Sequence, residues 1–410
     1  MLEPAARRKV ISLIKTLVVK HHFNIGNVDY ADWSRAVDEQ IPALLPADND
    51  VFEEGVRGLL CQLKSSHTNF YCSDTHPTMP QHAIGATLRS VTRDGAPRWM
   101  FLDVFEDGPA ACAGVSPGHR LISVNGTPAV PPSLPLFRFG HEHHVVVEIP
   151  HEKENRTVVV TVPPRTPKGR RQPLVEPKSI SYRMLRNIGI LKIPFFPGAF
   201  GIRFSRLLDA AVESLKAQGC DRLIIDLRGC LGGSLGFARL ASYLCPGRIP
   251  IGFDITRKRL ERGYNVEQLP RVPMPRTKLG LLFCLTRFSV QDKSLVLLTQ
   301  GLGKQPFHGR VVVLVNEWTN SAGEMAAQFA KDTKLATVVG IQTRGNVLGS
   351  TMFNVGHGYQ LYLPIFGWYS PSGNCGEGSG VQPDVPVEID PDRLAYGDDA
   401  QVKKALELLQ

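Results

Sequence analysis

The chain has 410 residues, 43% of them hydrophobic and 21% charged, which is typical of a globular protein with two or three domains. Its net charge of +9 arises mainly from scattered basic residues, a weak case for nucleic-acid binding. No apolar stretch approaches transmembrane length, and Lys15 interrupts the N-terminal apolar run, which lacks a cleavage site. We therefore expect a cytoplasmic protein without nucleic-acid partners or stable membrane insertion.

The sequence gives no strong metal-binding signature. The segment His141-Glu-His-His144 could suggest a metal site, but no further ligand motif accompanies it, so a polar loop is the favoured interpretation. The cysteines form no CxxC pair and have no zinc-finger spacing, and we expect reduced thiols, although a disulfide stays possible. These cysteines are Cys61, Cys72, Cys112, Cys220, Cys230, Cys245, Cys284 and Cys375.

Residues 1–79 are predicted to form a helical region. Apolar residues from Val10 to Val18 recur at helical spacing, and Asp48 precedes a further helical stripe that runs to Leu63. His67 follows that stripe amid small polar residues. This position suits a side chain facing a cleft, or a surface histidine near a helix C-terminus.

Residues 80–165 are predicted to form a compact β-rich domain, because three alternating strand-like runs surround a glycine-rich segment. That segment, 107–126, contains Gly-Pro-Ala, Ala-Gly-Val, Pro-Gly and Val-Asn-Gly in this order, and it resembles bacterial PDZ domains. The resemblance implies that an extended peptide adds to the sheet while backbone N–H groups hold its carboxylate. The candidate loop for that carboxylate is Ile84-Gly85-Ala86.

A Pro- and Lys/Arg-rich linker is expected at 166–178, followed by an α/β layer at 179–392 and a terminal helix at 393–410. Strand patterns at 187–193 and 222–227 flank a helical pattern. The second strand leads into a glycine-rich loop and another helix, and this alternation favours parallel strands. The whole chain is thus predicted to be an α/β (α+β) multidomain protein.

The segment from Gly309 to Asp332 is the centre of the functional prediction. Val311–Val315 has the pattern of a buried strand, a polar turn follows, and helix-forming residues begin after Ser321. The hydroxyl of Ser321 therefore lies near free N–H groups at a helix start, where a developing oxyanion would be stabilised. Ser321 is either a nucleophile or an N-cap residue, and serine is common as an N-cap.

Several motifs together resemble the C-terminal processing (tail-specific) serine peptidases and their relatives, the tricorn core protease and the interphotoreceptor retinoid-binding proteins. They are Asp-Leu-Arg-Gly-x-x-Gly-Gly at 226–233, Asn-Ser-Ala-Gly-Glu at 320–324 and Gly-Val-x-Pro-Asp at 380–384. With the helical N-terminus and the PDZ-like segment, the resemblance covers nearly the whole chain. It implies a crotonase-like α/β-layered peptidase core and a catalytic histidine in the N-terminal region.

The resemblance also implies the catalytic groups. One branch of the family uses a lysine base, but Asn346 occupies the matching position in this sequence, and an amide cannot take the proton. The tricorn-like branch uses a histidine and a glutamate, which here match His67 and Glu377. Relatives often carry an aspartate shortly before the histidine, whereas this chain has Lys64-Ser65-Ser66. The chain therefore resembles the Ser–His branch more closely.

In the mechanism implied by this branch, His67 takes the proton of Ser321, and Glu377 orients the imidazole directly or through another polar side chain. The N–H of Ala322 and an N–H of Gly232 or Gly233 would hold the oxyanion. Asp226 and Arg228 are expected to be a structural ion pair beside the glycine loop.

The predicted function is a serine endopeptidase that acts on peptides or unfolded-protein tails without metal or cofactor. Three alternatives stay open: a non-catalytic peptide- or hydrophobic-ligand-binding protein on the same fold, an esterase with the same triad, and a PDZ scaffold with a degenerate core. The Pro-containing segment 265–277 could cover the site. The sequence does not indicate the oligomeric state.

Overall fold

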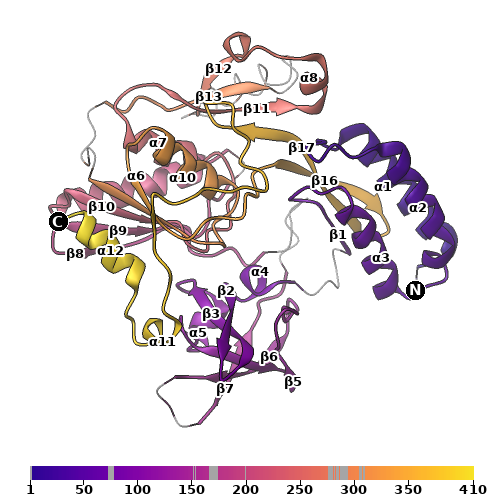
Figure 1. The fold of residues 1–410 in the computed structure, drawn as a ribbon, viewed down its shortest axis with the longest axis horizontal. Helices are drawn as coiled ribbons and strands as arrows, with labels where there is room; N and C mark the ends of the chain where they lie inside the picture. Colours follow the sequence, from indigo (N-terminus) through magenta and orange to yellow (C-terminus); the bar gives the residue numbers. More distant parts are fainter. Residues whose placement is uncertain are drawn as a thin grey trace.

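The computed structural model describes residues 2–72, 78–150, 152, 154–165, 174–198, 200–275, 280, 282, 286, 294–303, 307 and 310–410. It is a mixed α/β, multidomain structure with three six-stranded sheets among these residues, as the sequence predicts. In Figure 1 the N-terminal helices, the second sheet unit and the α/β core lie around a common centre. Cys284 and most of the predicted linker lie outside the described residues.

The N-terminal region is helical, as predicted, and contains α1 (Pro4–His21), α2 (Tyr30–Leu44) and α3 (Asn49–Cys61), followed by β1 (Asn69–Cys72). Asp48 is the N-cap of α3, since its side chain accepts from the N–H of Val51 at 2.8 Å. The apolar faces of the helices pack together with residues of β17, including Leu361 and Leu363, which are fully buried. This packing holds the loop after α3 against the rest of the protein.

The second unit is a sheet with strand order β2-β3-β4-β6-β7, in which β5 pairs with β4. Its elements are α4 (Pro80–Ala83), β2 (Ala86–Arg93), β3 (Ala96–Val104), α5 (Pro109–Cys112), β4 (Arg120–Val124), β5 (Thr127–Pro128), β6 (Glu142–Glu148) and β7 (Arg156–Thr161). All its strand pairs are antiparallel. Because β2 lies at one end of the strand order, it has a free edge within this sheet; the PDZ identity of the unit stays a prediction.

The core sheet has the order β18-β15-β14-β10-β9-β8, and every pair except β8–β9 is parallel. Its strands are β8 (Ser181–Leu185), β9 (Ile188–Lys192), β10 (Arg222–Asp226), β14 (Val311–Val315), β15 (Thr337–Gly340) and β18 (Val385–Pro386). All five residues of β14 are buried. Val313 joins the cluster with α6 (Ile202–Ala217), α7 (Phe237–Leu244) and α10 (Ala322–Asp332), whereas Leu314 packs against α12 (Ala400–Leu408). Burial on both faces explains the continuous apolar run.

A third sheet connects the N-terminal region to the core, with order β1-β17-β11-β13-β12 and β16 paired to β17. It contains β11 (Pro250–Thr256), β12 (Arg271–Pro273), β13 (Leu295–Leu298), β16 (Gly349–Gly356) and β17 (Tyr359–Tyr369), with α8 (Arg257–Arg262) and a 3-10 turn (Val266–Gln268) alongside. The described part of segment 265–277 belongs to this sheet through β12 and does not line the cavity described below. The suggestion from the sequence that this segment could cover the site stays a suggestion.

The C-terminal segment forms two short helices rather than the single predicted one: α11 (Pro391–Leu394) and α12. Gly397 has a φ of +74°, and Asp399 caps α12 by accepting from the N–H of Gln401 and Val402. The left-handed glycine and the new cap separate the two helices. Within the described residues, no helix combines the length and the apolar character that a membrane crossing would require.

Candidate active site

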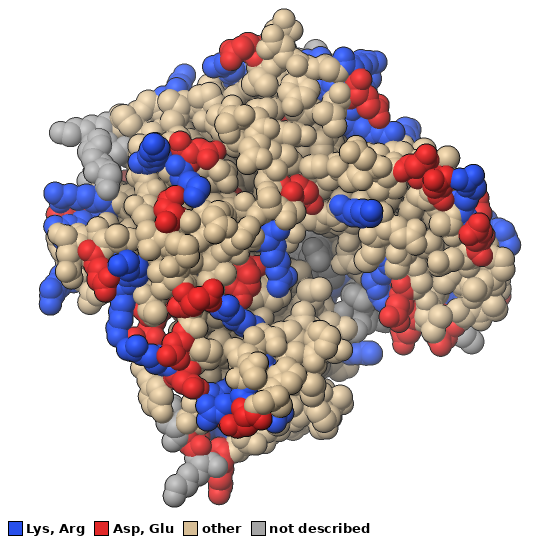
Figure 2. All heavy atoms as spheres, viewed as in Figure 1, with Lys and Arg blue, Asp and Glu red and all other residues tan. Residues whose placement is uncertain are grey.

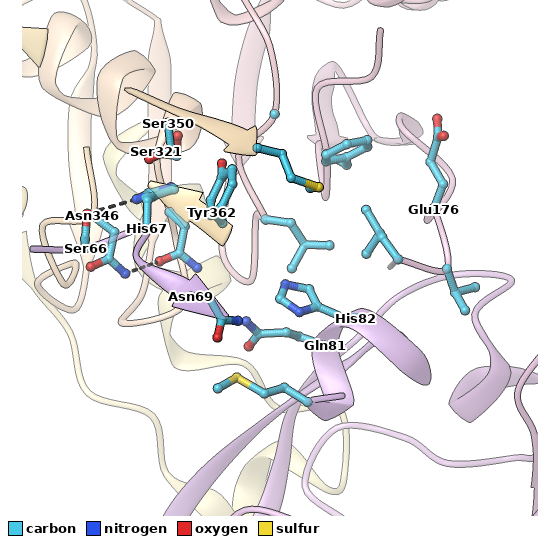
Figure 3. A pocket seen from close by; sticks show the side chains of 18 of the residues that line it. Ser66, His67, Asn69, Gln81, His82, Glu176, Ser321, Asn346, Ser350 and Tyr362 are labelled. Carbon is cyan, nitrogen blue, oxygen red and sulfur yellow. Dashed lines mark hydrogen bonds between the residues drawn. The ribbon is translucent and has the colours of Figure 1, made fainter. Parts of the chain in front are cut away.

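A cavity of about 920 Å³ lies where the N-terminal region, the second unit and the core meet. The space-filling view is hollowed at this junction (Figure 2). The lining comes from the loop after α3, from α4 and its approach, from residues 163–165 and 174–176, and from the turn before α10. Ser321 and His67 lie at the same end of this cavity in Figure 3. The two main predicted catalytic side chains are thus brought together from positions 254 residues apart in the chain.

Ser321 lies between β14 and α10, as predicted, and it is the N-cap residue of α10. Its φ of 51° and ψ of −117° are unusual for a residue other than glycine. Such strain is typical of a residue held by its surroundings at a functional turn. Its N–H donates to the carbonyl of Asn346 at 3.0 Å and to the Glu324 carboxylate at 3.1 Å. Ser321 is therefore both a helix cap and a cavity residue, so neither interpretation from the sequence excludes the other.

The glycine loop packs directly against Ser321. A Cβ placed on Gly232 would lie 2.7 Å from the Cβ of Ser321, so only glycine fits there. The N–H of Asn320 donates to the carbonyl of Cys230 at 2.9 Å and fixes the two loops together. Neither the N–H of Ala322 nor that of Gly233 donates a hydrogen bond to any residue that the structure describes. These two N–H groups are the available donors beside the serine.

The glycine loop is supported from below by the predicted ion pair. Arg228 Nη2 lies 2.8 Å from Asp226 Oδ2, and both side chains are buried. Arg228 Nη1 also reaches Asp399 Oδ2 at 2.7 Å, so the pair extends to the N-cap of α12. The prediction of a structural role for Asp226 and Arg228 is consistent with these contacts, which lie under the loop and outside the cavity lining.

Glu377 reaches His67 through Ser66. The Ser66 hydroxyl donates to Glu377 Oε2 at 2.9 Å and lies 2.9 Å from His67 Nδ1, while the Ser66 N–H donates to Glu377 Oε1 at 2.7 Å. Since the single hydroxyl proton of Ser66 is directed to the carboxylate, its oxygen accepts from Nδ1–H of His67. The other ring nitrogen, Nε2, then carries a free lone pair.

The imidazole of His67 lies in a partly buried site beside an aromatic ring. Its ring centre is 6.0 Å from that of Tyr362, and the planes are tilted by 49°. Burial lowers the pKa of His67 to about 4. The imidazole is therefore neutral at pH 7, which is the form that can accept a proton.

A second glutamate, Glu324, fixes the backbone beneath the serine. Its carboxylate is fully buried and accepts from the hydroxyl of Thr343 at 2.5 Å and from the N–H groups of Gly345 and Asn346 at 2.7 and 2.8 Å, besides that of Ser321. Burial raises its pKa, whereas these four donors favour the charged form. From the sequence, Glu324 was expected only as the last residue of the Asn-Ser-Ala-Gly-Glu motif, without this role.

The remaining predicted site residues lie elsewhere. Ile84, Gly85 and Ala86 connect α4 to β2 in the second unit and do not line the cavity. The carbonyls of Ile84 and Gly85 already accept from Ala110 and Phe105 at 2.9 and 2.8 Å. The N–H of Ile84 also donates, to the Pro80 carbonyl at 2.8 Å, so the predicted role as a carboxylate loop depends on the N–H groups of Gly85 and Ala86.

The segment His141–His144 does not converge on one point. His143 is buried and hydrogen-bonded to Asn125, whereas Glu142 and His144 are exposed on the opposite face of β6. Across the described ranges, no group of three or more His, Cys, Asp or Glu side chains could hold a metal ion.

Three features of the site were not found from the sequence. They are the bridge that Ser66 forms between Glu377 and His67, the hydrogen bonds of Glu324 to the backbone around Ser321, and Arg344. Arg344 lines the cavity, and its guanidinium carbon lies 3.9 Å from the ring centre of Trp318. The adjacent Ser-His pair was a possible signal for the relay, because a hydroxyl next to a histidine can bridge to a carboxylate. The contact of Ser66 with Glu377 spans 311 residues, so local patterning does not show it.

Comparison with known proteins now identifies the family of the core. Residues 187–387 match Peptidase family S41. This region, which is just under half of the chain, is therefore similar to members of that family. The chain is 23% identical over 82% of its length to a probable CtpA-like serine protease of Staphylococcus haemolyticus, and 27% identical over 92% of its length to a putative tricorn protease homolog of Streptomyces coelicolor. The predicted resemblance to C-terminal processing peptidases and their relatives is confirmed at this level.

The solved structure of the photosystem II D1 C-terminal processing protease has the same fold. Its TM-score is 0.56 at 18% sequence identity, and the match covers 98% of this chain and 97% of that one. The chain spans 60% and 30% of the lengths of the Staphylococcus and Streptomyces relatives, respectively. The S41 core is thus shared with longer proteins that contain further sequence.

Proposed function

We propose that the chain is a serine endopeptidase in which Ser321 is the nucleophile and His67 the general base. The observation that carries this proposal is the hydrogen-bonded chain from Glu377 through Ser66 to His67, which ends in the cavity that Ser321 lines. A base oriented by a third group and placed beside a nucleophile is the general arrangement of covalent hydrolysis.

In the proposed reaction, Nε2 of His67 takes the hydroxyl proton as Oγ of Ser321 attacks the peptide carbonyl carbon. The oxyanion accepts from the N–H groups of Ala322 and Gly233. The imidazolium then gives its proton to the leaving amine, which leaves an acyl-enzyme. Water hydrolyses the ester by the same steps, and the protein returns to its starting state. Ser66 and Glu377 keep Nδ1 protonated and stabilise the imidazolium.

The choice of a histidine base rests on the side chains around Ser321. No lysine is among the described residues that line the cavity. Asn346, at the position where the other branch has lysine, uses its side-chain amide to donate to Asn320 Oδ1 at 2.9 Å, and its carbonyl accepts from Ser321. Lys331 donates to the Gln382 carbonyl and to Asp384, outside the cavity lining. These contacts favour the Ser–His–Ser–Glu arrangement over a Ser–Lys pair.

The proposed substrates are peptides or unfolded-protein tails, with the second unit docking the substrate C-terminus. The free edge of β2 supports this part, since an extended peptide can add to such an edge. The relatives named as C-terminal processing enzymes, among them that of Bartonella bacilliformis, are consistent with substrate tails. Cytoplasmic location and freedom from cofactors stay predictions.

The test is labelling of the purified protein with a fluorophosphonate probe, comparing wild type with Ser321→Ala and His67→Ala. We expect labelling of wild type, none of Ser321→Ala, and at least a 100-fold slower reaction of His67→Ala, because general-base catalysis contributes about 10²–10⁴-fold. Labelling that survives in His67→Ala would show that another group is the base. A folded wild type that does not react would favour the non-catalytic binding alternative.

A further inference from the structure

One cation in the cavity has no role in the proposed chemistry. The Arg344 side chain is exposed, lines the cavity and stacks on the indole of Trp318, with 3.9 Å between its guanidinium carbon and the ring centre. Stacking of this kind is typical of arginine, and it leaves the edge of the guanidinium plane, with its N–H donors, open to a ligand.

Both partners of this stack are held in place by the fold. Thr343 and Gly345, on either side of Arg344, are hydrogen-bonded to the buried carboxylate of Glu324. The indole of Trp318 is 5% exposed and donates to the carbonyl of Leu88 at 3.0 Å. The guanidinium therefore rests on a fixed platform, so less conformational entropy is lost when it binds a ligand.

The positive charge of Arg344 is only partly offset within the protein. Among the described residues its guanidinium has no ion pair within 4.0 Å, and its electrostatic partner is Glu317 at longer range. Glu317 is shared, because it also pairs with Arg89 at 3.5 Å. Because Arg344 is exposed within the cavity that Ser321 also lines, its free N–H donors face the space where a ligand would lie.

The charges that line the cavity add to this imbalance. Among the described residues that line the cavity, the acidic one is Glu176. It lies 3.6 Å from Arg203, which offsets the charge of Glu176. A second guanidinium, that of Arg165, also lines the cavity. On the surface in Figure 2, in contrast, acidic and basic side chains alternate. The cavity therefore favours a ligand that carries negative charge.

We propose that Arg344 binds a carboxylate of the peptide substrate and so gives this site a preference for acidic substrates. The inference rests on the proposed function of the cavity. Arg344 lies two residues before Asn346, whose carbonyl accepts from the N–H of Ser321 at 3.0 Å. Because the segment that carries Arg344 contacts Ser321 directly, the bound carboxylate belongs to a residue near the scissile bond. A guanidinium binds a carboxylate with two parallel N–H···O bonds.

The carboxylate has two chemical sources, the free C-terminus of the substrate or an Asp or Glu side chain. Two series of fluorescein-labelled decapeptides of Ala, Leu and Tyr distinguish them. The first compares the free acid with the C-terminal amide. The second carries the amide throughout and has one Asp, or its neutral isostere Asn, at each position in turn.

The experiment measures binding of these peptides by fluorescence anisotropy to Ser321→Ala protein, in which no turnover occurs. We expect one carboxylate-bearing peptide to bind about 10-fold to 100-fold more tightly than its neutral match, because hydrogen bonds to charged groups are of that strength. This ratio should fall to within 2-fold of unity in Ser321→Ala/Arg344→Gln. Arg344→Lys, which keeps the charge without the planar fork, should give an intermediate ratio.

The ratio separates recognition from a structural effect. A structural disturbance by Arg344→Gln would weaken both members of a pair equally and leave the ratio unchanged, which would overturn the proposal. So would equal binding of all pairs, or the absence of peptide binding. Arg206→Gln, on the exposed surface of α6 away from the cavity, is the matched control and should keep the wild-type ratio.

Fluorophosphonate labelling of protein that retains Ser321 tests the proposed hydrolase function independently of peptide binding. Protein that does not label but keeps the Arg344-dependent ratio would be a binding protein for acidic peptides. Protein that labels but shows no such ratio would be a hydrolase in which Arg344 does not select the substrate.

Discussion

The two sides of the site each depend on a glutamate, and the two glutamates are used differently. On the nucleophile side, Glu324 is fully buried and accepts from four donors, none of which belongs to a titrating side chain. On the base side, Glu377 is half-buried and accepts from both polar groups of Ser66, which in turn contacts His67. The same chemical group fixes a backbone in one place and orients a base in the other.

A single segment joins these two sides. The N–H groups of Gly345 and Asn346 donate to Glu324, and the next one, that of Val347, donates to Glu377 at 3.1 Å. The distance between nucleophile and base is therefore set by three consecutive peptide groups rather than by direct contact between the two glutamates. This difference predicts that loss of Glu324 affects folding, whereas loss of Glu377 affects catalysis.

The largest expected effect is that of Glu324→Ala. The substitution leaves three buried or partly buried donors, those of Thr343, Gly345 and Asn346, without this acceptor, whereas the N–H of Ser321 keeps the Asn346 carbonyl. Each unsatisfied group costs about 1–3 kcal/mol. We expect the free energy of unfolding to fall by at least about 3 kcal/mol, a large part of the 5–15 kcal/mol typical of a domain. Urea denaturation followed by tryptophan fluorescence measures it. Glu213→Ala, at an exposed position of α6, is the control, and an equally small change in both variants would contradict the assignment.

The next effect is that of Glu377→Gln, which should lower kcat/KM by about 10²–10⁴-fold through loss of base orientation and imidazolium stabilisation. The amide oxygen can accept from only one of the two backbone N–H groups that Glu377 binds, those of Ser66 and Val347. We therefore expect the free energy of unfolding to fall by about 1–3 kcal/mol, less than in Glu324→Ala. Rates on a fluorogenic peptide and urea denaturation provide the two readings.

Ser66→Ala is the matched test of the relay, since it removes the hydroxyl but keeps the N–H that donates to Glu377 Oε1. If Glu377 acts through Ser66, the two single variants and the double variant should lose similar activity. Additive losses in the double variant would mean that Glu377 acts on His67 by another route.

The nucleophile side could be predicted largely from local sequence, and the base side could not. Val311 to Ala322 shows a buried strand, a polar turn and a helix start in sequence order, so the placement of Ser321 follows from neighbouring residues. His67 and Glu377 have no local pattern of this kind, and their assignment came from a family resemblance. Ser66 was noted only as a departure from that family, because its role depends on a contact that forms after three separate units have packed.

The α/β core was predictable for the same reason. The apolar residues of β14 are continuous because they meet helices on both faces, and that burial is readable in the sequence. The pairing of Trp318 with Arg344 was not readable, since one residue comes from the turn before α10 and the other from the segment before β16. Sequence patterning shows which face of an element is buried, but it does not show which two loops meet.

The base side has a further support that the nucleophile side lacks, and this gives a pH-dependent prediction. His22 is fully buried; Nε2 lies 2.8 Å from the Ser65 hydroxyl and Nδ1 lies 2.9 Å from that of Tyr30. Burial, and then the charge of Arg257, lower the pKa of His22 to about 4, below the ordinary value of 6.5. The unfolded chain therefore binds a proton here at a higher pH than the folded protein does.

The stability that neutral His22 allows is fully present above pH 6.5 and is lost as the pH falls toward 4. Because one pKa unit corresponds to about 1.4 kcal/mol, the loss is of the order of 3 kcal/mol. His22→Gln keeps hydrogen-bonding capacity but does not titrate. Between pH 6.5 and 4, the free energy of unfolding of this variant should therefore fall by about 3 kcal/mol less than that of wild type. Urea denaturation measures both pH profiles. If wild type and His22→Gln lost stability in parallel, the assignment of this pH dependence to His22 would be wrong.

The smallest expected effect tests how the nucleophile side is tied to the second unit. Trp318→Phe keeps an aromatic ring under Arg344 but removes the indole N–H that donates to Leu88, so we expect a loss of about 1 kcal/mol. Trp99→Phe is a matched control, because its indole also donates to a carbonyl at 3.0 Å, that of Ser133, within the second unit.

Both tryptophan variants should lower the free energy of unfolding by a similar amount. Only Trp318→Phe should also slow fluorophosphonate labelling of Ser321, by a few-fold, since Trp318 lies three residues before the nucleophile. Equal labelling rates in the two variants would mean that the contact between β2 and the turn before α10 stabilises the fold without positioning Ser321. A slower rate in Trp318→Phe alone would show that the second unit contributes to the geometry of the nucleophile as well as to the wall of the cavity.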